Sequence, residues 1–208
     1  MKLDYFDDVA NLLDFSHEGY YYLVDIVARR KNNIKDWVKY HLHDMNSHHI
    51  KCFLIESKEQ LLSLKDEIVS LCESNNCRVY IEPVLRKKSS LKNKITQYLE
   101  THNYELISYD DFYNNVLYEN SNTDICLYMG IDIDGDNSND ENITKYLELA
   151  SEINPNVQVL KIFNTPRGKW CLCTFFDYEK YFKKLEEYKY PYVGVGCYGG
   201  IPLYSNLK

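Results

Sequence analysis

The stretch that most constrains the fold runs from Ile125 to Asp134, where an apolar run leads into alternating isoleucines and aspartates. In a β-strand, side chains two residues apart point to the same face. We therefore expect Asp132 and Asp134 to lie side by side, with Ile131 and Ile133 on the opposite, buried face. Adjacent carboxylates repel each other, and Mg²⁺ or Mn²⁺ offsets that repulsion because both ions prefer hard oxygen ligands. This strand end is a candidate metal site.

A simpler interpretation of the same stretch stays open. The residues that follow, Gly-Asp-Asn-Ser at 135–138, are all turn formers, so the acids also fit the end of a strand that enters a turn. If the stretch does bind metal, Asp136 is the nearest further acid that can complete the ligand set.

Composition narrows the class of protein. The chain has 208 residues, of which 45% are hydrophobic and 14% aromatic, so it is globular rather than disordered. Its net charge of -7 excludes a uniformly basic nucleic-acid binder but leaves room for a local basic groove.

The cysteines and the apolar runs bear on location. Seven cysteines without a C-x-x-C pair fit no closed disulfide framework and indicate a reducing, intracellular compartment. The N-terminus has no apolar signal core, and no run approaches the roughly 20 apolar residues of a membrane span. We expect a cytoplasmic protein with no membrane partner.

The first half predicts a strand–helix–strand module. Residues 20–28 are apolar apart from Asp25, and their periodicity does not decide between helix and strand. Residues 49–55 predict a strand, and Ser57 with Gln60 begins a helix that continues to residue 74. A second strand at 77–81 and a helix at 91–100 follow. A polar boundary near residue 120 divides one compact domain into modules 1–120 and 121–208.

The second half predicts strands, a hairpin and two helices. The expected strands and helices, in order, are strand 124–134, helix 141–153, strands 157–163 and 170–176 joined by a hairpin, helix 177–188 capped by Asp177, and strand 193–197. Residues 201–204 are expected to form an apolar tail. This order predicts an α/β (α+β) fold with both helices on one face of an antiparallel or mixed sheet.

Four histidines cluster in residues 35–49, namely His41, His43, His48 and His49. Such spacing can bind zinc, but no cysteine or second histidine pair completes a tetrahedral site nearby. We interpret the segment as polar surface.

The hairpin Thr165-Pro-Arg-Gly168 is the second chemical feature, and Lys161 and Lys169 flank it. A glycine turn offers backbone N–H groups at close range, and the cationic side chains add charge, so this turn can hold a phosphate. Carboxylates that hold metal beside a basic hairpin are the parts of a nucleotidyl-transfer site. Ordinary turn chemistry explains the proline and the glycine equally well.

The order of these pieces resembles the archaeo-eukaryotic primase (primase–polymerase) superfamily, in particular its small phage and bacterial relatives. Asp132-Ile-Asp134 matches the superfamily's metal-binding D-h-D motif. Residues 165–170 match its phosphate-binding Thr-Pro-x-Gly-x-His motif except that Trp170 replaces the histidine. The third acid of the family, expected on a later strand, has no match in residues 192–197. Residues 77–81 followed by Arg86 resemble the first module of these relatives.

This resemblance implies a primase–polymerase-like fold with an RRM-like C-terminal module and Mg²⁺ or Mn²⁺ at Asp132 and Asp134. It implies nucleotide or single-stranded DNA as partner, a role in DNA replication, and a phage or mobile-element origin. The expected phosphate-binding residues are Arg78, Arg86, Lys161, Thr165, Arg167, Gly168 and Lys169. Because two motif positions are altered, we expect a catalytically degenerate protein that still binds. The alternatives are an active nucleotidyltransferase with a changed site, and a non-enzymatic protein that binds partners through its tyrosine-rich surface.

Overall fold

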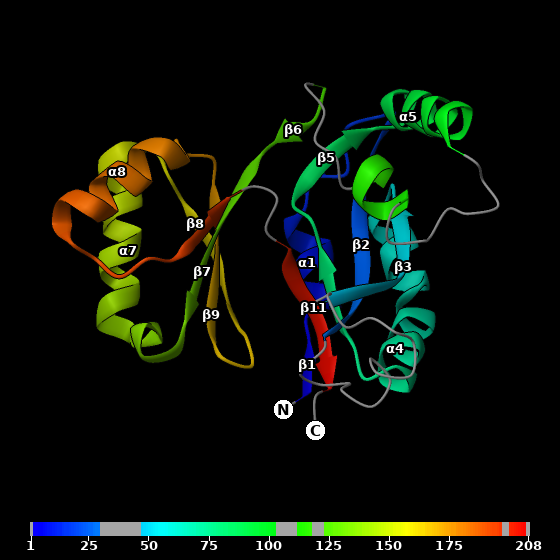
Figure 1. Cartoon of the computed structure of the whole chain (residues 1–208). Helices are drawn as coiled ribbons and strands as arrows, with labels where there is room; N and C mark the ends of the chain where they lie inside the picture. Colours follow the sequence, from blue (N-terminus) through cyan, green and yellow to red (C-terminus); the bar gives the residue numbers. More distant parts are fainter. Residues whose placement is uncertain (1, 30–46, 103–111, 118–122, 197–199, 207–208) are drawn as a thin grey trace. The chain divides into compact units, whose positions relative to one another are not determined.

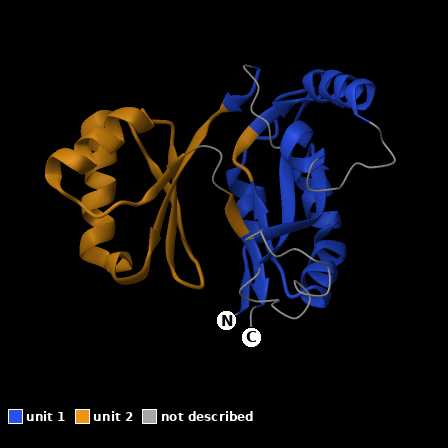
Figure 2. Cartoon of the chain, viewed as in Figure 1, with its two compact units in different colours: residues 1–81, 85–125, 203–208 blue, residues 82–84, 126–202 orange. Residues whose placement is uncertain are grey.

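The computed structural model describes residues 2–29, 47–102, 112–117, 123–196 and 200–206. The chain folds into two compact units (Figure 2): unit 1 contains residues 1–81, 85–125 and 203–208, and unit 2 contains residues 82–84 and 126–202. The boundary expected at residue 120 thus lies at 125–126, and the last residues belong to unit 1. Both units combine antiparallel strands with helices, as expected for an α+β fold.

Unit 1 is built on a seven-stranded sheet with the order β1-β11-β4-β2-β5-β6, in which β3 also pairs with β2 (Figure 1). Its strands are β1 (Lys2–Asp4), β2 (Tyr20–Arg29), β3 (Ser47–Ile55), β4 (Arg78–Ile81), β5 (Val84–Lys87), β6 (Ile125–Cys126) and β11 (Ile201–Asn206). Its helices are α1 (Phe6–Leu12), α3 (Lys58–Ser63), α4 (Lys65–Ser74), α5 (Lys88–Thr101) and the π-helical η3 (Tyr113–Leu117).

The apolar run that periodicity left undecided is the strand β2. It pairs antiparallel with β3 along one edge and with β4 and β5 along the other. Residues 21–28 are all buried, which explains why the run lacks the alternation of a half-exposed strand.

Two expectations for unit 1 need correction. The helix expected across residues 57–74 is capped as predicted, with Gln60 N donating to Ser57 Oγ at 3.1 Å, but Leu64 divides it into α3 and α4. The apolar tail expected at residues 201–204 is the strand β11, which pairs antiparallel with β1. An apolar segment without alternation is typical of a strand buried between neighbours, and β11 lies between β1 and β4.

Unit 2 has a β-α-β-β-α-β order, and its four strands pair antiparallel in the order β10-β7-β9-β8. This is the split βαβ arrangement. Its elements are β7 (Tyr128–Asp134), the short 3₁₀ helix η4 (Gly135–Ser138), α7 (Asp140–Ile153), β8 (Val159–Asn164), β9 (Gly168–Thr174), α8 (Tyr178–Tyr188) and β10 (Gly194–Gly196). The expected pairing of 157–163 with 170–176 is confirmed by the register, which sets Phe163 opposite Trp170.

The core of unit 2 lies between one face of this sheet and its two helices (Figure 1). The strands contribute Ile131, Ile133 and Cys171, while α7 contributes Tyr146 and α8 contributes Tyr181. Both helices therefore cover the same face, as predicted. The predicted cap of α8 is also present, because Asp177 Oδ1 accepts hydrogen bonds from Glu179 N and Lys180 N, both at 3.1 Å.

Candidate functional site

Asp132 and Asp134 lie on the sheet face opposite the helices, as the strand pattern predicts. Both side chains are exposed, while Ile131 and Ile133 are fully buried in the core. The alternation arises because β7 is covered by helices on one face only. The chain therefore places two carboxylates side by side at the end of β7.

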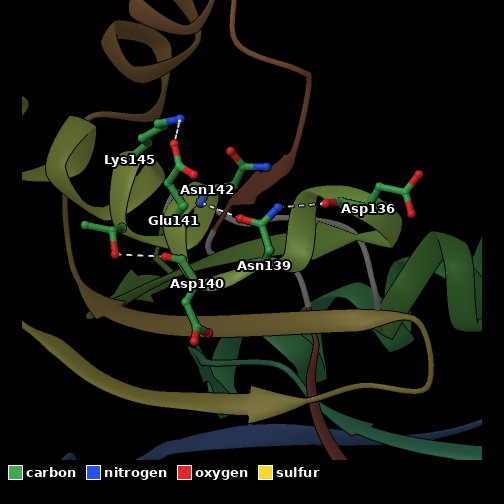
Figure 3. A network of polar contacts seen from close by, with 7 residues as sticks. Asp136, Asn139, Asp140, Glu141, Asn142 and Lys145 are labelled. Carbon is green, nitrogen blue, oxygen red and sulfur yellow. Dashed lines mark hydrogen bonds and ion pairs between the residues drawn. The ribbon is translucent and has the colours of Figure 1, made fainter.

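The turn after Asp134 is stabilised within itself (Figure 3). Asn139 Oδ1 accepts a hydrogen bond from Asn142 N at 2.9 Å and caps α7, while Asn139 Nδ2 donates to the backbone oxygen of Asp136 at 3.1 Å. Gly135 has a φ of +64°, which favours glycine. This is the turn chemistry of the simpler interpretation, and it does not exclude metal binding at the strand end.

No group of three or more His, Cys, Asp or Glu side chains within the described ranges is arranged to hold a metal ion. Asp136 therefore does not complete a three-acid set with Asp132 and Asp134. Two carboxylates alone match Mg²⁺ or Mn²⁺ only where a substrate supplies further oxygens, since Mg²⁺ commonly binds through one or two carboxylates plus substrate phosphates.

The hairpin lies beside the acidic strand end. Asp134 is directly opposite Gly168 in the ladder of β7 and β9, and Gly135 N donates to the backbone oxygen of Arg167 at 2.8 Å. A Cβ on Gly168 would come within 2.0 Å of Ile133 O, so glycine is required by this close approach. The two motifs that the sequence singles out therefore meet at one end of the sheet of unit 2.

The hairpin's backbone donors point inward to its own threonine. Thr165 Oγ1 accepts from Gly168 N at 3.0 Å and from Arg167 N at 3.3 Å. A phosphate at this turn would therefore be held by cationic side chains more than by the backbone. Arg167 Nη1 lies 3.9 Å from Asp134 Oδ2, and both side chains are more than half exposed, so this ion pair is weak.

The two flanking lysines lie on different faces of the sheet. Lys161 is opposite Leu172, whose face is shared with Trp170 and Asp132. Lys169 is opposite Ile133 and therefore lies on the helix-covered face, where its Nζ donates to Asn164 Oδ1 at 2.5 Å. Of this pair, Lys161 alone shares the face of the acids.

Trp170 and Gly194 flank Asp132 on the two neighbouring strands. Trp170 is 4% exposed, lies beside Phe163 with 6.1 Å between ring centroids, and covers Gly130. It is the buried strand aromatic that the sequence favoured. A Cβ on Gly194 would lie 3.4 Å from Asp132 Cβ, an ordinary contact. The histidine and the third acid of the family motif would both border Asp132 in this register.

Arg78 and Arg86 belong to unit 1, whereas the other seven candidate residues belong to unit 2. Arg78 is 8% exposed and donates from Nη1 to Tyr80 Oη at 3.4 Å. Arg86 is 3% exposed and lies 3.6 Å from Asp124. Each is built into the sheet of unit 1.

A polar cluster in unit 1 was missed at the level of sequence. Asp25 Oδ2 contacts His49 Nδ1 at 2.8 Å and accepts from Tyr113 Oη at 3.1 Å, and the His49 ring stacks on Tyr113. Asp25 is 6% exposed. The expectation of a polar surface segment is thus wrong for His49, while His41 and His43 lie outside the described residues. An aspartate within an otherwise apolar strand was the available signal.

No family model matches the chain, and neither a curated protein nor a solved structure matches it. Among the described residues, no helix has both the length and the apolar character needed to cross a membrane.

Proposed function

We propose that unit 2 is a primase–polymerase-like module with an RRM-like sheet, which has lost much of its catalytic machinery and still binds a nucleotide or single-stranded nucleic acid. The observation that carries this proposal is the position of Asp132 between Trp170 and Gly194 on three adjacent strands. In the superfamily that the sequence resembles, a metal-binding acid, a histidine and a third acid come from three such segments. Here the segments meet in one row but supply an indole and a glycine.

Metal binding at this row would depend on the ligand. Asp132 and Asp134 provide two carboxylates, and Mg²⁺ or Mn²⁺ would take its remaining oxygens from the phosphates of a nucleotide and from water. Lys161 and Arg167 lie on or beside the same face and would attract the phosphates. Affinity should therefore be low without nucleotide and should fall as ionic strength rises.

Catalysis should be lost more completely than binding. Phosphoryl transfer depends on positioning and on charge stabilisation, and loss of one preorganised electrostatic contact costs roughly 10²–10³ in rate. Trp170 offers a single N–H donor, and Gly194 offers no side chain. We therefore expect no detectable primer synthesis or extension.

The binding test measures nucleotide affinity and melting temperature at increasing Mn²⁺ concentrations. Mn²⁺ should raise the melting temperature, because a ligand that binds only the folded state stabilises it. The double change Asp132→Asn with Asp134→Asn should abolish the response. Asp140→Asn, which removes one exposed acid from the following helix, is the matched control and should leave it unchanged. The absence of any response in the unmodified protein would favour the acidic-turn interpretation.

A primer-extension assay with Mn²⁺ tests the loss of catalysis. Robust extension that disappears in Asp132→Ala would show that the site is active despite its changes. If Asp136→Asn also removed that extension, Asp136 would be the acid that replaces the missing ligand.

A protein-interaction role is a second candidate, favoured by one aromatic surface of unit 2. Tyr192 is 79% exposed, and its ring stacks on Phe182 with 5.4 Å between centroids and 3° between planes. Tyr178 contacts the same Phe182 ring edge-on. Exposed aromatics of this kind occur at protein interfaces. Self-association that is seen by light scattering and lost in Tyr192→Ser, together with no nucleotide binding, would select this function.

A further inference from the structure

A shallow pocket in unit 1 lies between β5, α5 and η3 and is separate from the acidic row of unit 2. It has about 190 Å³ of empty space, part of it open to solvent. Three of its side chains are cationic, Arg86, Lys87 and Lys94, and one is acidic, Asp124. The remaining lining residues are Tyr21, Ser90, Leu91, Val116 and Leu117. The lining thus carries a formal excess of two positive charges.

The sheet fixes the position of the buried arginine. Arg86 is directly opposite Tyr21 in the ladder of β2 and β5, and both side chains lie at the floor of the pocket. Arg86 Nη1 is 3.6 Å from Asp124 Oδ2, which is longer than the roughly 2.7–2.9 Å of a charge-assisted hydrogen bond. Asp124 therefore offsets part of the guanidinium charge without forming the close, two-pronged contact that arginine makes with a matched anion.

The helix α5 supplies the wall. Lys87, Ser90, Leu91 and Lys94 are spaced three and four residues apart, so they lie along one side of the helix. The first turn of α5 contains no acid. The lysines and the serine hydroxyl of this wall are hydrogen-bond donors of the kind that bind phosphate oxygens.

The opposite side of the pocket is apolar. Val116 and Leu117 come from the π-helix η3, a conformation that is rare and frequently found at functional sites. Their side chains exclude water from one side of the pocket, and a lower local dielectric strengthens the attraction between the cations and an anion.

We propose that this pocket binds a phosphate group through Arg86, Lys87, Ser90 and Lys94. Its volume is below the roughly 300–1,000 Å³ of sites that enclose a drug-sized ligand, so the phosphate enters while the rest of the ligand stays outside. The phosphate comes from either a small phosphorylated molecule or the backbone of a single-stranded nucleic acid. The proposal concerns unit 1 alone and stands whether or not unit 2 binds nucleotide.

The first experiment measures melting temperature and calorimetric binding with inorganic phosphate, a nucleoside 5′-monophosphate and a short single-stranded oligonucleotide, against chloride at matched ionic strength. Phosphate should raise the melting temperature where chloride does not. Tighter binding of the monophosphate than of the oligonucleotide identifies a small molecule as the source, and the reverse order identifies a strand backbone. No protection by any of the three probes at tens of millimolar phosphate would overturn the proposal.

Variants locate the binding without disturbing the buried arginine. Lys87→Gln and Lys94→Gln should each weaken phosphate binding by roughly three- to tenfold. Lys92→Gln removes a cation of the same helix that does not line the pocket, and it should have no effect. Equal weakening by all three changes would show a general charge effect and contradict the pocket. Arg167→Gln, in the hairpin of unit 2, should leave this binding intact, which separates it from the proposed function of unit 2.

Discussion

Trp170 lies directly across from Asp132 in the ladder of β7 and β9, and its indole covers the backbone of Gly130. A Cβ at Gly130 would come within 2.1 Å of the indole Cζ2 atom. The two positions are therefore matched: the large ring requires a neighbour without a side chain. This packing assigns to Trp170 a structural role at the position where a phosphate ligand is expected.

The matching of Gly130 and Trp170 can be measured directly. Gly130→Ala should destabilise the protein by about 1–3 kcal/mol, because an added methyl in a packed site forces side chains and backbone to shift. The same change in a Trp170→Leu background should cost less, since the smaller side chain leaves room. Urea denaturation of the four proteins gives the coupling energy.

Gly194→Ala is the control for this cycle, because a Cβ there meets only an ordinary contact. An equal loss from Gly130→Ala in both backgrounds would show that the ring does not restrict this position.

Gly194→Asp should create a metal site. The new carboxylate would stand beside Asp132 on the neighbouring strand, so repulsion should lower stability without metal. Mn²⁺ should raise the melting temperature of Gly194→Asp more than that of the unmodified protein. Gly194→Asn has nearly the same shape without the charge, and an equal Mn²⁺ response in the two variants would contradict the prediction.

The buried thiols should make stability fall in alkaline solution. Burial raises the pKa of Cys72, Cys77 and Cys173 to about 12, and that of Cys171 to about 11. A folded-state pKa raised above the unfolded value of 9.0 gives stability that is complete below pH 9 and is lost as pH rises toward the folded pKa. Denaturation measured at pH 7, 9 and 10 should show this decline.

The same burial protects these thiols from chemistry. At pH 8 a thiol reagent should label the half-buried Cys52 and Cys126 before the four buried thiols, because the thiolate is the reactive form. Complete labelling should require denaturant. Rapid modification of Cys171 or Cys173 in the native protein, located by mass spectrometry, would show that the core of unit 2 opens.

The cluster around Asp25 predicts two graded losses of stability. Tyr113→Phe removes one of two hydrogen bonds to Asp25 Oδ2 and should cost about 1 kcal/mol. Asp25→Ala leaves both His49 and Tyr113 without their acceptor and should cost more, on the order of 2–4 kcal/mol. A larger effect of Tyr113→Phe than of Asp25→Ala would show that the carboxylate is not the centre of the cluster.

Local patterns predicted most of unit 2 because each of its elements has a strong local signal. Ile131 and Ile133 alternate with acids along β7, Asp177 caps α8, and the hairpin contains proline and glycine. The strands follow one another with short connections, so neighbours in sequence are also neighbours in the sheet. The face of Asp132 and Asp134 was predicted for the same reason.

Unit 1 was harder to predict because its pairings join distant segments. Nothing local in residues 201–206 indicates that they pair with β1, and the apolar run of β2 does not alternate, since neighbours bury it along its length. The contacts of Asp25 with His49 and Tyr113 span 24 and 88 residues. The inward donors of the hairpin were also beyond reach, because the rotamer of Thr165 decides where they point.

The position of β11 has a consequence for how the protein is made. It lies between β1 and β4, yet the ribosome synthesises it after residues 126–202, which contain every helix and strand of unit 2. Unit 2 can begin to fold while the sheet of unit 1 still lacks an interior strand, and closing that sheet joins segments from the two ends of the sequence at an entropic cost. During synthesis, β1 and β4 wait as unpaired edges, and edges of this kind are sites of aggregation. The order of translation thus makes unit 1 the last part to mature and the part most dependent on chaperones.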